Sequence, residues 1–350
     1  MWRSSVRHAG FGKDHECMGK KIICMLLCLI VCLSVGYAEE PPSFKRYQDA
    51  LQWVQENRPM HLDLGETSLK ISQIADLKAA MPEGGSVSFS LNWCKTTVTD
   101  QDTEVDLNGS LLSVSEKDIR SLLALCPQLK KLTVSKHREL SNKIMMPLVD
   151  ENPDIEFVWL IRIGGYTLVS NQTAYSTMKK RTEGYRLRSS ELEPLRYAKN
   201  LRALDLGHHD ITDISVIGEL TELRILILGD NKIEDLSPLA NLTHLQYAEL
   251  FTNRIKDISP LAGCTELLDL NLTVNQITDI TPLMGCMQLE RVWASHNKFE
   301  ESGVEAFRET HPNCILDLTN AHPTADDWRH HPRYNQYLAM FKSKTWKPFE

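Results

Sequence analysis

A 22-residue unit repeats without insertion in the second half of this chain, and it constrains the fold more than any other feature. Its five copies share apolar residues at positions one, four, six and eleven, and four of them hold Asn at position nine. One unit alone cannot bury its apolar side chains, whereas several stacked units can. The chain is therefore expected to coil into a solenoid. The copies begin at Leu201, Leu223, Leu245, Leu267 and Leu289.

The residue types within each unit predict its local structure. The alternating Leu-x-Leu at positions four to six is typical of a short strand, with the leucines inward and the intervening side chains outward. An Asn at position nine can satisfy buried backbone groups of the turn, and stacked units would repeat those bonds. Pro238, Pro260 and Pro282 hold position sixteen. Because proline is not tolerated in a helix interior, we expect a tight return turn rather than a long helix.

These residues resemble the leucine-rich repeat family, in particular its 22-residue internalin-like bacterial class. Residues 267–283 match the string L-x-x-L-x-L-x-x-N-x-I-x-D-I-x-P-L. Residues 245–261 match it except at position four, which holds Ala248. The first copy departs further, with His209 in place of Asn and Val216 in place of Pro. The resemblance implies an α/β repeat solenoid with short parallel strands on its concave face, irregular longer N-terminal repeats and helical caps.

The N-terminal 38 residues have the pattern of a signal peptide. Lys20 and Lys21 precede the apolar run 22–35, and a small-x-small sequence ends at Ala38. Such a basic start, apolar core and small-residue site predict cleavage and secretion. An uncleaved membrane anchor is the alternative, although the run is short for a span of about 20 residues. Residues 1–17 are interpreted as a start-site extension ahead of Met18.

The rest of the chain divides by pattern into a capping helix, an irregular region, the regular repeats and a second cap. Phe44, Tyr47, Leu51 and Val54 recur at helical spacing, and longer, degenerate repeats with β-rich inserts follow them. The last 50 residues contain spaced aromatics that predict an apolar C-terminal cap. The predicted segments are 39–59, 60–200, 201–299 and 300–350.

The outward strand positions of the regular repeats are candidates for a partner-binding face. Parallel strands lie about 4.8 Å apart, so five of them make a face roughly 19 Å wide. Exposed aromatics beside Arg and carboxylates are typical of residues that dominate the energy of protein interfaces. The alternative is that loops or the irregular region cover these aromatics as core. The candidates are Ile225, Ile227, Tyr247, Glu249, Phe251, Asp269, Arg291 and Trp293.

Charge and motif content exclude several classes of function. Residues 39–350 contain 34 basic and 44 acidic residues, which gives a net charge of −10. This negative charge argues against nucleic acid as a partner. No catalytic or nucleotide-binding motif of the common classes occurs. We therefore expect no cofactor. We also expect no metal, because the five cysteines after the leader lack the spacing of a zinc site. Their odd number and wide spacing do not make a disulfide framework. These cysteines are Cys94, Cys126, Cys264, Cys286 and Cys314.

The sequence thus predicts a non-catalytic, monomeric, protein-binding scaffold, secreted or at the cell surface, with no membrane span in the mature chain. Glycan or cell-wall binding through Tyr247, Phe251 and Trp293 is one alternative, because aromatic faces also stack on sugars. A hydrolase is a less favoured alternative, and self-association is a third. The hydrolase would use the outward carboxylates Asp205, Glu249 and Asp269.

Overall fold

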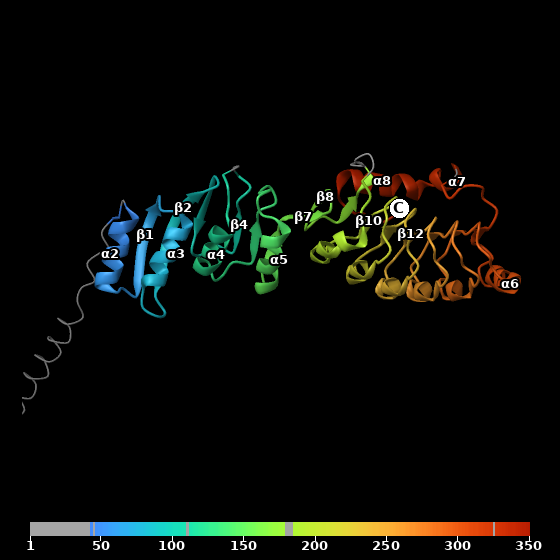
Figure 1. Ribbon diagram of the computed structural model, residues 1–350, viewed down its shortest axis with the longest axis horizontal. Coiled ribbons are helices and arrows are strands. Elements are labelled where there is room, and N and C mark those ends of the chain that lie inside the picture. Colours follow the sequence, from blue (N-terminus) through green and yellow to red (C-terminus); the bar gives the residue numbers. More distant parts are fainter. Residues whose placement is uncertain (1–42, 45, 110–111, 179–184, 325) are drawn as a thin grey trace, which may run out of the picture. The chain divides into compact units, whose positions relative to one another are not determined.

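The structure is a computed structural model that describes residues 43–44, 46–109, 112–178, 185–324 and 326–350 (Figure 1). The predicted signal peptide and its start-site extension lie outside the described residues. The chain divides into two compact units, residues 1–91 and 92–350, which are considered separately. Within the described ranges, no helix has both the length and the apolarity that a membrane span requires.

The first unit alternates helix and strand. Helix α2 (Tyr47–Asn57) forms where the sequence analysis expected a capping helix, and it packs against α3 (Ile71–Ala80). Strands β1 (His61–Thr67) and β2 (Ser86–Trp93) pair in parallel with Leu62 opposite Val87, and residues 86–91 of β2 belong to this unit. Both of these side chains are buried, together with Val54 of α2 and Ile74 and Leu77 of α3.

The second unit begins with long, irregular repeats. Strands β4, β5 and β6 form a parallel sheet, and an α-helix follows each of the first two. Ser115 caps α4 by accepting a hydrogen bond from the Asp118 amide, and the Asp118 carboxylate accepts one from the Ser115 amide. The hairpin β7–β8 follows. The elements are β3 (Thr96–Thr99), β4 (Glu104–Asp106), α4 (Glu116–Leu125), β5 (Lys131–Thr133), α5 (Asn142–Glu151), β6 (Glu156–Val158), β7 (Leu160–Ile163) and β8 (Tyr166–Val169).

The regular repeats build a parallel sheet, which among the described residues has seven strands in chain order. Its pairing is in register, so Leu204, Leu226, Ala248 and Leu270 lie side by side. The expected α/β leucine-rich repeat solenoid is confirmed. The strands are β9 (Ala174–Ser176), β10 (Ala203–Asp205), β11 (Ile225–Ile227), β12 (Tyr247–Glu249), β13 (Asp269–Asn271), β14 (Arg291–Trp293) and β15 (Ile315–Asp317).

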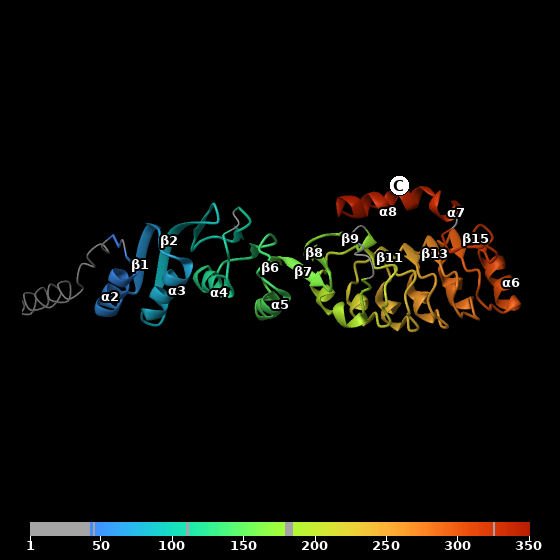
Figure 2. The same ribbon diagram turned by 45° about the horizontal axis from the view of Figure 1, so that its top comes forward.

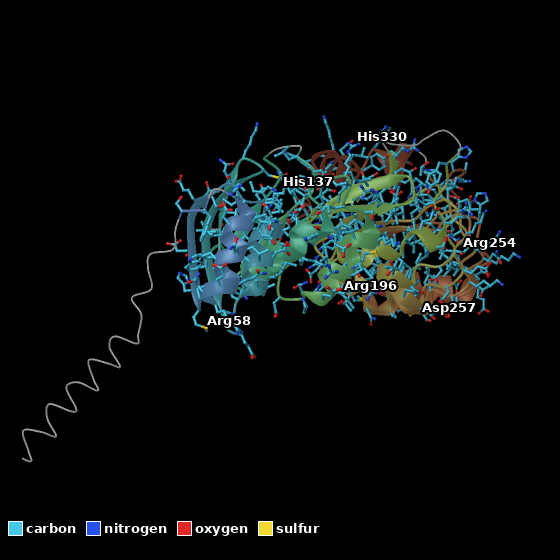
Figure 3. All side chains as sticks on the ribbon, turned by 60° about the vertical axis from the view of Figure 1, so that its left-hand side comes forward. Arg58, His137, Arg196, Arg254, Asp257 and His330 are labelled. Atoms are coloured by element: carbon cyan, nitrogen blue, oxygen red, sulfur yellow. The ribbon has the colours of Figure 1, made fainter. Side chains whose placement is uncertain are left out.

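Short 3-10 helices make the return path of the first four regular repeats, and the α-helix α6 (Glu301–Thr310) makes that of the fifth. Pro238, Pro260 and Pro282 sit in the first turns of η5, η6 and η7, where the missing N–H is not needed. Charged residues such as Arg254 and Asp257 lie exposed on the turns (Figure 3). The helices are η2 (Ser189–Glu191), η3 (Glu193–Tyr197), η4 (Ser215–Glu219), η5 (Ser237–Asn241), η6 (Ser259–Gly263) and η7 (Thr281–Gly285).

A ladder of buried asparagines joins successive repeats. The Asn253 amide nitrogen donates to the carbonyls of Leu228 and Leu250, both at 3.0 Å, and its oxygen accepts from the Ile233 N–H at 3.0 Å. Asn231, Asn275 and Asn297 repeat this pattern.

His209 takes the ladder position in the first copy. Its Nδ1 accepts from the Leu187 N–H at 3.2 Å, and its Nε2 lies 2.9 Å from the Thr177 hydroxyl. The imidazole thus gives the Leu187 N–H of the neighbouring irregular turn a hydrogen-bond acceptor, which explains why this position holds His and not Asn.

The later residues of the predicted cap, 326–350, do not cover the end of the solenoid. After α6 (Glu301–Thr310) and β15, the chain turns back as α7 (Asp326–Arg329) and α8 (Pro332–Ser343), and α8 packs against β9 and β10 (Figure 2). The last strand is consequently an edge strand with Ile315 61% exposed. We call residues 326–350 the C-terminal strap.

The ladder predicts a large effect of replacing one asparagine. Asn253→Ala leaves several buried backbone groups without partners, each costing about 1–3 kcal/mol, so the free energy of unfolding should fall by about 3 kcal/mol. Urea unfolding measures this. The matched control is the exposed Asn241→Ala, with an expected change within about 0.5 kcal/mol. Equal effects of the two substitutions would contradict a structural role for the ladder.

Candidate functional site

The predicted partner-binding residues lie together on the sheet face, the side of strands β9–β15 turned away from the leucine-filled interior. Register places Tyr247 beside Asp269, and Asp269 beside Arg291. However, all eight predicted residues are between 0 and 6% exposed. The expectation that they are exposed is therefore wrong for the chain as it is folded here. The eight are Ile225, Ile227, Tyr247, Glu249, Phe251, Asp269, Arg291 and Trp293.

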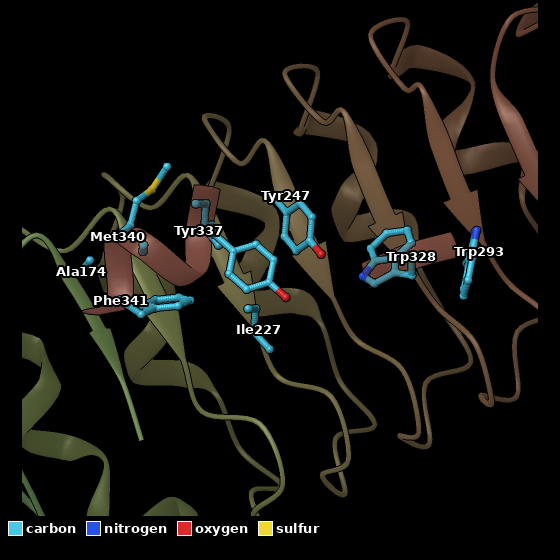
Figure 4. Packing of buried hydrophobic residues seen from close by; sticks show 10 residues of the cluster. Ala174, Ile227, Tyr247, Trp293, Trp328, Tyr337, Met340 and Phe341 are labelled. Atoms are coloured by element: carbon cyan, nitrogen blue, oxygen red, sulfur yellow. The ribbon is translucent and has the colours of Figure 1, made fainter. Parts of the chain in front are cut away.

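The C-terminal strap buries most of these side chains. Apolar residues from both surfaces form one cluster, with Trp328 between Tyr247 and Trp293 at ring-centroid distances of 5.7 and 5.3 Å (Figure 4). Tyr337 lies 5.0 Å from Tyr247. The cluster comprises Ala174, Ala203, Ile225, Ile227, Tyr247 and Trp293 from the sheet face, and Trp328, Tyr337, Met340 and Phe341 from the strap.

Phe251 has a different environment from the other seven residues. Its ring lies over Gly229, where an added Cβ would come within 2.4 Å of the ring carbons. The His208 ring packs edge-on against it, with 6.4 Å between centroids. Phe251 therefore packs on residues of the two preceding repeats and is not part of the strap cluster.

Glu249 is the central polar group of the sheet face. Its Oε1 accepts hydrogen bonds from Trp328 Nε1 at 2.8 Å and from the Tyr337 hydroxyl at 3.1 Å, both in the strap. The Tyr247 hydroxyl on the same strand also donates to it. Burial raises the pKa of Glu249 above its ordinary value, although these donors act in the opposite direction.

Asp269 joins the sheet face to the strap through two guanidinium groups. Arg291 Nε on the next strand donates to its Oδ1 at 2.6 Å, and Arg333 Nη1 of α8 donates to its Oδ2 at 2.8 Å. Arg333 also pairs with Glu290. The Arg291 guanidinium lies 4.5 Å from the centroid of the Trp328 ring, at cation–π distance. These contacts pair two guanidinium groups with the buried Asp269 carboxylate and the exposed Glu290 carboxylate.

Further contacts hold both ends of the C-terminal segment. Before α7, the Asn271 amide donates to the Pro323 carbonyl at 2.6 Å. After α8, the Trp346 N–H donates to the Thr173 hydroxyl at 2.8 Å, and the Arg202 guanidinium lies 5.1 Å from the Trp346 ring centroid. The segment thus spans the sheet from β13 to the residue before β9.

The strap residues are the part of this site that sequence reasoning missed. The spacing of Trp328, Tyr337 and Phe341 indicated an apolar face, but not which surface it covers. A usable signal was the pair Glu249 and Asp269, because buried carboxylates require donors. The strap supplies them as an indole, a phenol and a guanidinium.

The carboxylates of the hydrolase alternative are each engaged in structural bonds. Asp205 accepts from the Ser176 hydroxyl at 2.6 Å and from the Gly207 N–H at 3.0 Å. Glu249 and Asp269 are tied to the strap as described. Within the part of the chain that the structure describes, no group of three or more His, Cys, Asp or Glu side chains is arranged to hold a metal ion.

Comparison with known proteins agrees with the repeat architecture. Residues 199–241 match the family model "Leucine Rich repeats (2 copies)". The search of curated proteins finds no match to this sequence.

Among the similar solved structures are three from two bacteria. An internalin (inlF) of Listeria monocytogenes is 22% identical with a TM-score of 0.39, covering 73% of this chain and 67% of that one. Internalin C2 of the same species is 19% identical with a TM-score of 0.34, covering 73% and 88%. A leucine-rich repeat protein of Leptospira interrogans is 16% identical with a TM-score of 0.33, covering 73% and 71%.

Burial of Glu249 predicts a pH-dependent stability. Because its pKa is raised in the folded chain, the stability that this group contributes is present below its unfolded pKa and is lost as the pH rises through the folded value. Glu249→Gln removes the charge, so the free energy of unfolding of the variant, relative to the unaltered chain, should increase from pH 4.5 to pH 7.

Denaturant unfolding across this pH range measures the difference. The exposed Glu305→Gln serves as the control, and its profile should follow that of the unaltered chain. A Glu249→Gln profile parallel to that of the unaltered chain would show that the carboxylate titrates normally in its buried position.

Proposed function

We propose that the chain, which folds as a repeat solenoid and matches a leucine-rich repeat model over residues 199–241, is a non-catalytic scaffold, secreted or exposed at a cell surface, that binds a protein partner on the sheet face. The extracellular location rests on the leader pattern of residues 1–38. The binding face rests on the side chains of β10–β14, which combine aromatic, aliphatic and charged groups.

The observation that carries the proposal is that the sheet face already holds a polypeptide segment. The strap is seated through side chains, with an indole between two aromatic rings and three polar anchors at Glu249, Asp269 and Thr173. The aromatic side chains and the Arg of this surface are of the types enriched in protein interfaces, and paired charges add specificity to such a contact. The same chemistry would serve a segment of another protein.

Seven of the eight predicted residues divide into two kinds of proposed contact. Tyr247 and Trp293 would supply aromatic contact area, with Ile225 and Ile227 beside them. Glu249, Asp269 and Arg291 would fix the orientation of the bound partner through charge-assisted hydrogen bonds. Phe251 would lie at the margin, since it packs on Gly229. A protein is favoured over a glycan because the buried carboxylates here accept from indole, phenol and guanidinium donors, which proteins carry.

The test uses a strap-loosened chain, Trp328→Ala, because changes on the sheet face would otherwise also release the strap. A photo-crosslinking residue at position 247 captures the partner on intact cells, and calorimetry then measures its affinity. In this background, Tyr247→Ala and Trp293→Ala should each weaken binding at least tenfold, as expected for central aromatic residues.

The control is Met287→Ala, a change of an exposed apolar residue away from the sheet face, which should leave the affinity unaltered. Unchanged affinity in both sheet-face variants would refute the assignment of the partner to this face. Capture of a glycan instead of a protein would support the aromatic sugar-binding alternative.

A further inference from the structure

The C-terminal strap occupies the surface on which the proposed function depends. Resting on that function, we infer that the strap is an intramolecular stand-in for the partner. The partner then presents a helical segment, divided as α7 and α8 are, that carries an indole on its first helix and a guanidinium and a phenol on its second, in the order of Trp328, Arg333 and Tyr337. It binds by displacing α7 and α8.

The solenoid has its own core, which does not include the strap. Leu204, Leu226 and Leu270 are fully buried in the interior, on the other side of the strands. The strap cluster is separate and contains only sheet-face and strap residues. The strap therefore covers the sheet face of a repeat array that already has a packed core, as a bound ligand would.

The sheet face recognises polar groups as well as apolar area. Glu249 is buried and accepts from two strap donors, and Asp269 is buried and accepts from Arg333. Burying carboxylates is unfavourable unless donors meet them, and a purely structural cover is often as stable or more stable with apolar residues. The carboxylates of Glu249 on β12 and Asp269 on β13 instead require a hydrogen-bond donor of the covering segment at each of these two strands.

The order of anchors follows from the helix geometry of the strap. Arg333, Tyr337 and Phe341 are spaced four residues apart on α8, so they share one side of the helix. Trp328 of α7 lies over the β12–β14 end of the sheet, while α8 packs on β9 and β10. Figure 4 shows the aromatic anchors in this sequence along the sheet face. A competing segment needs the same order of anchors over two helices to meet Glu249 and Asp269 together.

Competition with the strap sets the conditions of binding. A tethered segment has an effective concentration of about the millimolar range, so a free helix at micromolar concentration competes poorly with it. Weakening the strap while leaving the sheet face unaltered should therefore expose the site.

The probe is a fluorescent synthetic peptide of residues 324–350. Its affinity is measured by anisotropy for the unaltered full chain and for the strap variant Trp328→Ala/Tyr337→Ala, whose folding is checked by circular dichroism. The strap variant should bind the probe at least tenfold more tightly. Asn335→Ala, an exposed position on α8, is the matched control and should bind like the unaltered chain.

Two further arms separate this inference from the proposed function. A scrambled probe of the same composition should bind the strap variant at least tenfold more weakly than the ordered probe. Asp269→Asn in the strap-variant background should weaken the ordered probe severalfold, but should have little effect on a probe with Arg333→Gln. Equal binding of ordered and scrambled probes would overturn the inference while leaving a protein-binding face. Failure of every probe to bind would contradict both.

Hydrogen–deuterium exchange on the unaltered chain keeps the inference testable if the strap variant does not fold. A saturating concentration of the probe should speed exchange of the chain's own α8 amides and leave β10–β13 protected. Unchanged α8 exchange, with the probe bound, would show that the strap is not displaced and would overturn the inference.

Discussion

In-register pairing of parallel strands is the constraint on which the second unit depends. Because the repeat has 22 residues, positions 22 apart in the sequence become neighbours, and the Asp269–Arg291 ion pair joins two such positions. The same register stacks the buried asparagines, whose amides connect each turn to the next. Side chains on the sheet face are therefore fixed by the backbone pairing beneath them, and the strap meets a surface that is already arranged.

The polar contacts on that surface explain why the strap adopts one position. Apolar packing alone is non-directional and tolerates sliding along the sheet. Trp328 and Tyr337 must both reach Glu249, whereas Arg333 must reach Asp269 and Glu290. Removing one partner of a buried ion pair leaves the other charge desolvated, which typically costs about 3–5 kcal/mol. Charge pairing thus determines the position of a segment whose burial is largely apolar.

Local sequence determined the repeat fold because the signals act within a single unit. The Leu-x-Leu alternation, the Asn at position nine and the proline at position sixteen each predicted the element that forms there. The outward positions were also assigned correctly to one side of the sheet. Their burial was not predicted, because it depends on residues 326–350, which follow the regular repeats. Helical spacing of Tyr337 and Phe341 shows that a helix has an apolar side, but the surface that it covers is a long-range property.

The crossing of several strands by a single strap has a consequence for how this array can change in size. Duplication of a 22-residue unit between β9 and β12 would move Thr173 away from Glu249 by about 4.8 Å, the spacing of adjacent strands. The strap contacts groups at both ends of this interval, with Trp346 at Thr173 and Trp328 at Glu249. A longer array would lose one of these contacts unless the strap gained residues as well. Repeat number and strap length are therefore expected to vary together during evolution.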